Sequence, residues 1–468
     1  MAASIDTMPA ATRALIIAIV AVFVGSAIIG IWRVYSPIPM FDDWGNYLGF
    51  YADLLDGRYS AWFADYSGHR TVLPRALMWL DIRYFGGRFV FLIIANLLML
   101  GAIVAVLIAG LRRLTPDPRL RLVVGATICV GAVSWLQANN LAGGHAGANW
   151  FMAVLLPLLA CFALARAKAE PKVFWLALLA GFASAWTLAN GLLVLPLLAG
   201  FALAIGLKPA RIALLAIAAA TAIALYFDFF SGAQGPLLAG YWSALTGDPV
   251  SAVQYVLAFL GSPFFDVVSY PLAMLQYLRQ GGAAGPAPRP DFGGNLLTDY
   301  PDAFALGSDA AQAAGAAFVV VAIILARRWL ASEREPTSGA LLTFVAFIIA
   351  TAAAGAAARP GIHNSFGPEF LTAALLAWLA LAVLAAPSLS LPRALGIFAC
   401  TAILLLPSQL LPVLGLRRIA DTHARRQQAM QAILQGSDDP ATLAVLDADP
   451  AVVRRLRGTK VSIFADGP

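Results

Sequence analysis

The feature that most constrains this chain is a series of long apolar runs that recurs from near its start to about residue 412. A helix needs about 20 apolar residues to cross the hydrocarbon core of a bilayer, and most of these runs approach that length. Hydrophobic residues make up 60% of the sequence and charged residues only 12%, whereas about a quarter of an average soluble domain is charged. No water-soluble core could bury so much apolar surface, so the sequence predicts an all-α polytopic membrane protein.

The apolar runs predict about eleven transmembrane helices. They fall at 14–32, 88–110, 120–138, 149–165, 173–189, 191–207, 211–230, 310–326, 339–358, 368–386 and 393–412. The first run, Ala14 to Trp32, is longer than the apolar core of a secretory signal, so we interpret it as an uncleaved helix. The stretch from Val250 to Phe265 is apolar enough to form a re-entrant segment or part of an extra pair of spans.

The basic residues of the short loops indicate the orientation of the chain. Arg and Lys recur in every second loop, after the second, fourth, sixth, eighth and tenth helices, whereas the alternate loops carry almost none. Loops that retain positive charge stay in the cytoplasm. The pattern predicts a bacterial inner-membrane protein with a cytoplasmic N-terminus and a periplasmic C-terminus. It also accounts for the net charge of +6 without a nucleic-acid partner.

Three polar segments interrupt the transmembrane domain, 1–412, or follow it, and all three are expected in the periplasm. The first loop, 33–87, holds two short amphipathic stretches that suit helices lying on the membrane surface. The segment 231–309 is a long loop rich in Gly, Pro and aromatic residues. The tail, 413–468, is a small helical appendage in which two Asp-Pro-Ala triplets each cap a short helix.

Asp42 and Asp43 form an acidic pair soon after the first predicted helix. Two carboxylates side by side at a membrane edge suit a general base. They could also hold a divalent cation such as Mg²⁺ or Mn²⁺, and no other cofactor is expected. The alternative is that they cap the surface helix that starts near Gly45.

His69, Arg70 and Arg75 form a second polar cluster in the same loop. The two guanidinium groups could each bind two oxygens of a phosphate or a carboxylate. The alternative is that they balance the charge of the several aspartates in this loop.

A third cluster, which includes His145, Asn149 and Trp150, carries no formal charge. Amides, an aromatic ring and a histidine suit a sugar or a lipid headgroup. Ordinary loop and helix-cap contacts are the alternative.

Arg359, His363 and Glu369 form the fourth cluster. Arg359 is the only basic residue in the short loops predicted to be periplasmic, which favours an anionic partner. The predicted spans carry almost no ionisable residue, which argues against a proton- or ion-driven transporter.

The chain is predicted to begin with one helix, followed by an acidic pair with two surface helices and then a helical bundle. This order of features resembles that of the GT-C superfamily of integral membrane glycosyltransferases. It also looks like a group of bacterial polytopic membrane proteins of that shape. The stretches that carry the resemblance are FDDW at 41–44, GHR and LPR within 68–75, NW at 149–150, WTLANGLLVLP at 186–196, YVLAFLGSPF at 255–264 and DADPAVVRRLRGTKVSIF near the end.

The resemblance implies an inverting enzyme that moves a sugar from a polyprenyl-phosphate donor to a glycan or lipid acceptor in the periplasm. It implies Asp42 or Asp43 as the general base and Arg359, with Arg70 or Arg75, at the donor phosphate. The residues expected to orient the sugar or acceptor are His69, His145, Asn149, Trp150, His363 and Glu369. The alternatives are a lipid-linked oligosaccharide polymerase or flippase and a non-catalytic membrane scaffold.

Overall fold

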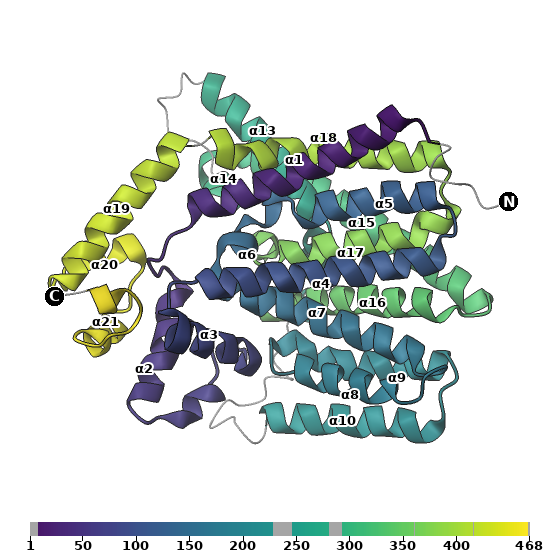
Figure 1. Ribbon diagram of the computed structural model, residues 1–468, viewed down its shortest axis with the longest axis horizontal. Coiled ribbons are helices and arrows are strands. Elements are labelled where there is room, and N and C mark those ends of the chain that lie inside the picture. Colours follow the sequence, from purple (N-terminus) through teal and green to yellow (C-terminus); the bar gives the residue numbers. More distant parts are fainter. Residues whose placement is uncertain (1–7, 228–245, 280–292, 360, 415, 467–468) are drawn as a thin grey trace.

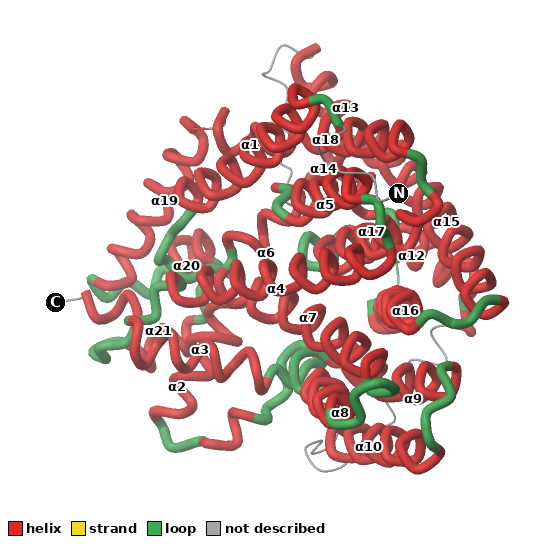
Figure 2. The backbone as a smooth tube through the Cα atoms, turned by 45° about the vertical axis from the view of Figure 1, so that its right-hand side comes forward, coloured by secondary structure: helices red, strands yellow, loops and turns green. Residues whose placement is uncertain are grey.

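A computed structural model describes residues 8–227, 246–279, 293–359, 361–414 and 416–466, and every regular element in these ranges is a helix. Long helices lie side by side, and the shorter helices of the first loop and of the tail gather at one end of this bundle (Figures 1 and 2). The long helices fit a multi-pass membrane protein, as the sequence predicts.

Nine helices in the described ranges are long and apolar enough to cross a membrane. They are α1 (Ala10–Val34), α4 (Val90–Leu114), α5 (Pro118–Ala132) continued by η4 (Trp135–Gln137) and α6 (Ala138–Ala142), α7 (Gly144–Arg166), α10 (Pro209–Phe227), α15 (Pro301–Ala331), α16 (Pro336–Ala358), α17 (Leu371–Ala385) continued by η7 (Ala386–Ser388), and α18 (Leu391–Leu414). Each of them coincides with a predicted span.

The remaining two predicted spans are shorter than expected. They contain α8 (Val173–Ser184) and α9 (Val194–Ala204), joined through η5 (Ala189–Leu193). The 12 residues of α8 extend about 18 Å, well short of a bilayer core of about 30 Å. The chain turns after α8, and Gly191 then lies against the end of that helix. An added Cβ would sit only 1.8 Å from the Ser184 carbonyl oxygen, so the close approach requires glycine.

The predicted re-entrant stretch is a bent pair of helices, α12 (Pro249–Leu260) and α13 (Ser262–Arg279), which meet at 79°. This geometry is that of a broken span or a re-entrant loop. At the bend, a Cβ added to Gly261 would lie 1.8 Å from the Ala311 carbonyl oxygen of α15, so the two backbones touch. The short α14 (Gly293–Asp299) follows. Of the loop predicted at 231–309, residues 231–245 and 280–292 lie outside the described residues, and residues 301–309 belong to α15.

Both helices predicted in the first loop are present. The first comprises η2 (Asp43–Gly49) and α2 (Phe50–Leu55), and the second is α3 (Val72–Phe85), with η3 (Tyr59–Trp62) between them. The apolar residues of the first helix are largely buried within the protein, as Trp44 and Tyr47 show. Those predicted to line the second helix stay partly or fully exposed, as Leu77 and Tyr84 show. Protein therefore covers the apolar face of the first helix but not that of α3.

The tail packs onto this first loop. It consists of α19 (Leu416–Leu434), α20 (Pro440–Leu446), α21 (Pro450–Leu456) and η8 (Ser462–Asp466). Both predicted aspartate caps are confirmed, because Asp439 accepts a hydrogen bond from the Thr442 amide and Asp449 accepts one from the Ala451 amide. Arg455 forms ion pairs of 2.8 and 2.7 Å with Asp53 and Asp56 of the first loop. The two segments, far apart in sequence, thus form one layer at this end of the bundle.

The basic loops gather at the opposite end, where α1 begins (Figure 1). Arg334 donates a hydrogen bond of 2.8 Å to the Ala204 carbonyl, and Arg211 donates one of 3.1 Å to the Ala167 carbonyl. These bonds join three of the Arg- and Lys-containing loops. The alternation of basic and neutral loops along the sequence therefore corresponds to the two opposite ends of one helical bundle.

Which end faces the cytoplasm stays a prediction, and fusions can test it. A reporter fused after Lys208 should give a cytoplasmic signal, and one fused after Pro468 should give a periplasmic signal, because basic loops are retained inside. A cytoplasmic signal from the Pro468 fusion would reverse the orientation and with it the side of every candidate residue.

Candidate active site

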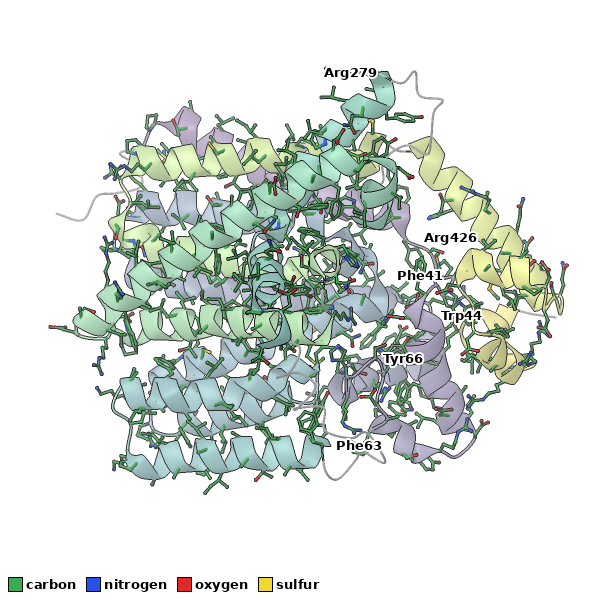
Figure 3. All side chains as sticks on the ribbon, turned by 180° about the vertical axis from the view of Figure 1, so that it is seen from behind. Phe41, Trp44, Phe63, Tyr66, Arg279 and Arg426 are labelled. Carbon is green, nitrogen blue, oxygen red and sulfur yellow. The ribbon has the colours of Figure 1, made fainter. Side chains whose placement is uncertain are left out.

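The polar residues singled out in the sequence gather at the end of the bundle that carries the first loop and the tail. Figure 3 places Trp44 and Tyr66 of the first loop between the long helices and the tail. Four parts of the chain contribute: the start of η2, the turn before α3, the first turn of α7, and the loop that contains η6 (Ile362–Phe366).

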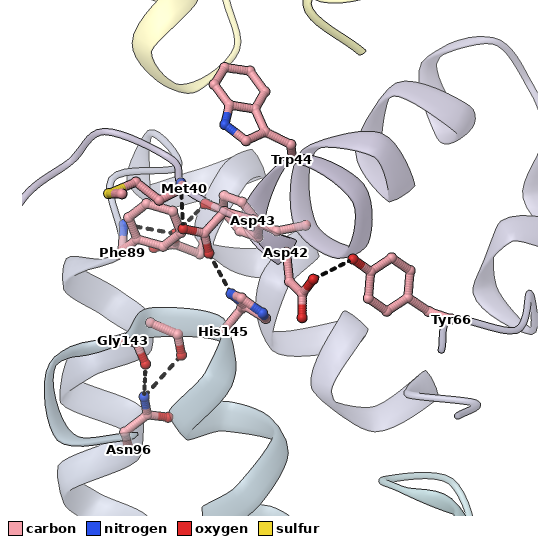
Figure 4. A network of polar contacts seen from close by, with 12 residues as sticks. Met40, Asp42, Asp43, Trp44, Tyr66, Phe89, Asn96, Gly143 and His145 are labelled. Atoms are coloured by element: carbon pink, nitrogen blue, oxygen red, sulfur yellow. Dashed lines mark hydrogen bonds and ion pairs between the residues drawn. The ribbon is translucent and has the colours of Figure 1, made fainter. Parts of the chain in front are cut away.

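Asp43 is the most tightly held carboxylate of the site. Its Oδ2 accepts a hydrogen bond of 2.9 Å from the Met40 amide, and its Oδ1 forms a close ion pair with Nδ1 of His145 (Figure 4). Both side chains are largely buried, with 16% of Asp43 and 12% of His145 exposed. Nδ1 donates its proton to Asp43, so Nε2 is the ring nitrogen that remains for a further partner.

The first turn of α7 is held by close backbone packing. Asn96 of α4 donates hydrogen bonds to the carbonyl oxygens of Gly143 and Gly144, at 3.3 and 2.9 Å. A Cβ added to Gly147 would lie 2.2 Å from the Asn96 side chain. Glycine is thus required for close approach, and the packing fixes the position of His145 beside the acidic pair.

Asp42 differs from its neighbour because it is exposed. Its Oδ1 accepts a hydrogen bond of 2.9 Å from the Tyr66 hydroxyl, while no hydrogen bond or ion pair to Oδ2 comes from the described part of the chain. Burial, and then the Asp42 charge, raise the pKa of Tyr66, so its phenol remains a donor. Asp42 precedes η2 but makes no side-chain cap bond, so the capping alternative is not supported.

Arg359 and Glu369 face each other across the loop that contains η6. One guanidinium nitrogen of Arg359 lies 3.4 Å from a Glu369 carboxylate oxygen, and the group lies over the Phe370 ring, 5.7 Å from its centre. The Arg359 side chain is 45% exposed. Burial raises the pKa of Glu369, and the nearby Arg359 charge opposes that rise. This guanidinium is therefore accessible to an anion from solution.

Contacts between these clusters show that they form one site. Asn140 donates a hydrogen bond of 3.0 Å to the Glu369 carbonyl, and the Trp150 ring meets the Phe370 ring edge-on at 5.3 Å. The negative charge of Asp42 also contributes to the raised pKa of Glu369. The first, third and fourth predicted clusters are thus neighbours in space.

His69 links the second cluster to this site. Its Nδ1 accepts a hydrogen bond of 3.2 Å from the Ala189 amide, which places the proton of the neutral ring on Nε2. Burial, and then the Arg359 charge, lower its pKa to about 4. His69 is therefore a neutral donor near Arg359 at neutral pH.

Arg70 and Arg75, predicted to bind phosphate, point their donors at the backbone instead. Arg70 is buried and donates to the Tyr226 carbonyl at 3.0 Å. Arg75 is also buried, and it donates to the Ala61 and Ala64 carbonyls at 2.8 and 2.6 Å. Burial lowers the pKa of Arg75 to about 10. These contacts favour a structural role in which both residues shape the first loop.

The remaining predicted residues differ in exposure. Asn149 is buried, and its Oδ1 has no hydrogen-bond partner within the described ranges. His363 is exposed on η6. Tyr66 was not predicted as a site residue. Its position three residues before His69, which was predicted, is a signal in the sequence that could have indicated it.

The residues present do not fit a divalent-cation centre built from protein ligands alone. In the ranges that the structure describes, no three His, Cys, Asp or Glu side chains are grouped so that they could hold a metal ion. Both oxygens of Asp43 already have partners, which leaves the free oxygen of Asp42 as the principal ligand. A cation held by protein ligands alone would need about six oxygen ligands, whereas magnesium is often held by one or two carboxylates with water and phosphate oxygens.

Comparison with protein-family models finds no match, and no match is found among curated proteins or among solved structures. The geometry of the site is therefore the basis on which its function is inferred.

Proposed function

We propose that this protein is a membrane glycosyltransferase that moves a sugar from a polyprenyl-phosphate donor to an acceptor outside the cytoplasm. The observation that carries the proposal is the exposed carboxylate of Asp42, which has one free oxygen and shares its site with the exposed guanidinium of Arg359. A base and an anion-binding group at one membrane edge suit transfer from a lipid-linked phosphate.

In the proposed reaction, Asp42 Oδ2 accepts the proton of an acceptor hydroxyl as that oxygen attacks the anomeric carbon of the donor. The bond from this carbon to the phosphate oxygen breaks, and its electron pair leaves with the polyprenyl phosphate. A single displacement of this kind inverts the anomeric configuration. Tyr66 donates to the other Asp42 oxygen, which favours the charged form of the base.

The other residues have supporting roles in this scheme. Arg359 offsets the charge that develops on the departing phosphate, and its planar group can donate two parallel hydrogen bonds. The pair of Asp43 and His145 fixes the turn that carries Asp42. Glu369 positions Arg359 through their ion pair. Each role depends on contacts within one cluster.

A transfer assay tests the proposal. The purified protein in lipid nanodiscs is incubated with undecaprenyl phosphate bearing single hexoses of defined anomeric configuration, together with simple glycosides and lipid alcohols as acceptors. We expect product with the opposite anomeric configuration by NMR and release of undecaprenyl phosphate. Retained configuration would exclude the single displacement. Movement of the intact lipid across the bilayer without transfer would favour a flippase.

A further inference from the structure

A surface cavity lies at the basic end of the bundle, opposite the candidate active site. Its walls come from three parts of the chain: the loop after α7, the end of α9 and the loop between α15 and α16. The cavity has a volume of about 290 Å³, and the charged side chains in its lining are Lys168, Glu333 and Arg334. None of the candidate site residues lies here, so the cavity needs an explanation of its own.

The loops around the cavity are strongly basic. They hold eight Lys and Arg but only three Glu, counted over 166–172, 204–211 and 327–336. Two of the three carboxylates already have partners. Glu170 forms an ion pair of 2.6 Å with Arg166, and Glu335 caps α16 by accepting a hydrogen bond of 2.9 Å from the Thr337 amide. Glu333 is therefore the one carboxylate of these loops that remains for the surrounding cations.

The two cations of the lining are held without a carboxylate partner in the described part of the chain. Lys168 is exposed and forms no hydrogen bond or ion pair there. Arg334 donates a hydrogen bond of 2.8 Å to the Ala204 carbonyl, and its φ of +55° lies in the left-handed region that side chains disfavour. Such strain concentrates at functional sites. A strained arginine beside an unpaired lysine indicates a site for an anion.

The cavity lies at the edge of the apolar surface of the bundle. Leu203 and Leu330 are 68% and 52% exposed, and they lie one and two residues away from Ala204 and Ser332 of the lining. Trp329 is half-buried beside Leu330, and tryptophan is enriched at the level of the lipid headgroups. A polar cavity with exposed leucines at its edge fits a lipid whose headgroup enters the cavity and whose acyl chains follow the helices.

We propose that this cavity binds the headgroup of an anionic phospholipid of the phosphatidylglycerol type. Two positive side chains and one negative side chain leave the lining with one net positive charge, which matches the single negative charge of a phosphodiester. Lys168 and Arg334 donate to the phosphate oxygens, and Glu333 accepts from the glycerol hydroxyls of the headgroup. The lipid comes from the leaflet at the basic end, which is predicted to be the cytoplasmic one.

Two other ligands share part of this chemistry. Phosphatidylethanolamine carries an ammonium group that could pair with Glu333, but the excess of cations around the cavity repels that group. Free phosphate, or a phosphate ester from solution, has the required negative charge but no acyl chains to cover Leu203 and Leu330. Comparison of lipids and of soluble phosphates therefore distinguishes the three.

Native mass spectrometry of the full chain in detergent tests the site. Delipidated protein is titrated with phosphatidylglycerol, phosphatidylethanolamine and phosphatidylcholine that carry the same acyl chains. We expect one phosphatidylglycerol molecule to bind more tightly than either of the other lipids. The double variant with Lys168→Ala and Arg334→Ala should bind it about thirtyfold more weakly, because each basic residue near a lipid phosphate contributes about a fivefold gain in affinity.

Two further variants serve as controls. The charge-conserving double variant, with Lys168→Arg and Arg334→Lys, should retain most of the affinity, because both positive charges remain. Arg113→Ala removes an exposed arginine from the last turn of α4, at the same end of the bundle but outside the cavity lining, and should leave the affinity unchanged. A loss in Arg113→Ala as large as in the double alanine variant would mean diffuse attraction to the basic end and would overturn the site.

Soluble competitors identify the source of the phosphate. Glycerophosphoglycerol, which is the headgroup without acyl chains, and inorganic phosphate should displace the lipid only weakly. Displacement by either compound at the concentration of the intact lipid would overturn a lipid ligand. Equal affinity for the three lipids, or a preference for phosphatidylethanolamine, would overturn the proposed headgroup. None of these readouts uses sugar transfer, so the outcome is independent of the proposed function.

Discussion

Replacing Asp42 by Asn should lower the rate of sugar transfer by at least about a hundredfold, the usual scale for loss of a general base. Asparagine keeps the shape of the side chain and still accepts a hydrogen bond from Tyr66, but it cannot take a proton from the acceptor. Because Asp42 is exposed, the midpoint of thermal unfolding should stay close to that of the wild type. The measurement is single-turnover transfer in nanodiscs.

Asp43→Asn should behave differently from Asp42→Asn. The change weakens a largely buried pair with His145, so it should lower the free energy of unfolding by about 1–3 kcal/mol as well as the rate. Asp302→Asn, which changes an exposed carboxylate at the start of α15, is the matched control and should leave the rate unchanged. A normal rate for Asp42→Asn with an inactive but stable Asp43→Asn would transfer the role of base to Asp43.

Arg359→Lys should weaken donor binding or turnover about tenfold, equivalent to about 1.4 kcal/mol. Lysine keeps the positive charge but loses the planar group that can hold two phosphate oxygens at once. Arg359→Ala should have a larger effect, although it also leaves the Glu369 carboxylate without its ion pair. The lysine variant is therefore the cleaner test of phosphate binding.

The measurement for Arg359 is the affinity for undecaprenyl phosphate together with the transfer rate. Arg58→Lys is a suitable control, because Arg58 is 54% exposed in the first loop and forms its ion pairs with Asp53 and Asp56, away from Arg359. It should change neither quantity. Wild-type affinity and rate in Arg359→Lys and Arg359→Ala would exclude Arg359 from the donor site.

The positions of the long helices could be predicted from hydropathy, because each span must supply its own apolar length. The shortness of α8 and α9 could not, since the turn between them involves a close contact of Gly191 with the Ser184 carbonyl that hydropathy does not reveal. The 79° bend at Gly261 likewise depends on contact with α15. The amphipathic α19 was not predicted, because it lacks the Asp-Pro-Ala triplet that marks the start of each of the two helices after it.

The residue types of the candidate site could be predicted from the sequence, but the contacts between those residues could not. Asp43 and His145 are 102 positions apart, and no periodicity in one sequence indicates that they meet. The same limit applies to Arg70 and Arg75, because the sequence does not reveal whether a guanidinium faces solvent or backbone carbonyls. Tyr66 was overlooked for a related reason, since its partner Asp42 lies 24 positions away.

The most direct test of the central proposal is a cryo-EM structure of the Asp42→Asn variant in nanodiscs with undecaprenyl phosphate bearing a hexose. This variant should bind the donor without consuming it. We predict that the lipid phosphate lies within hydrogen-bond distance of the Arg359 guanidinium, with the anomeric carbon open toward residue 42. A phosphate more than about 6 Å from that guanidinium, beyond the range of a close ion pair, or one bound at the end where α1 begins, would contradict the proposal.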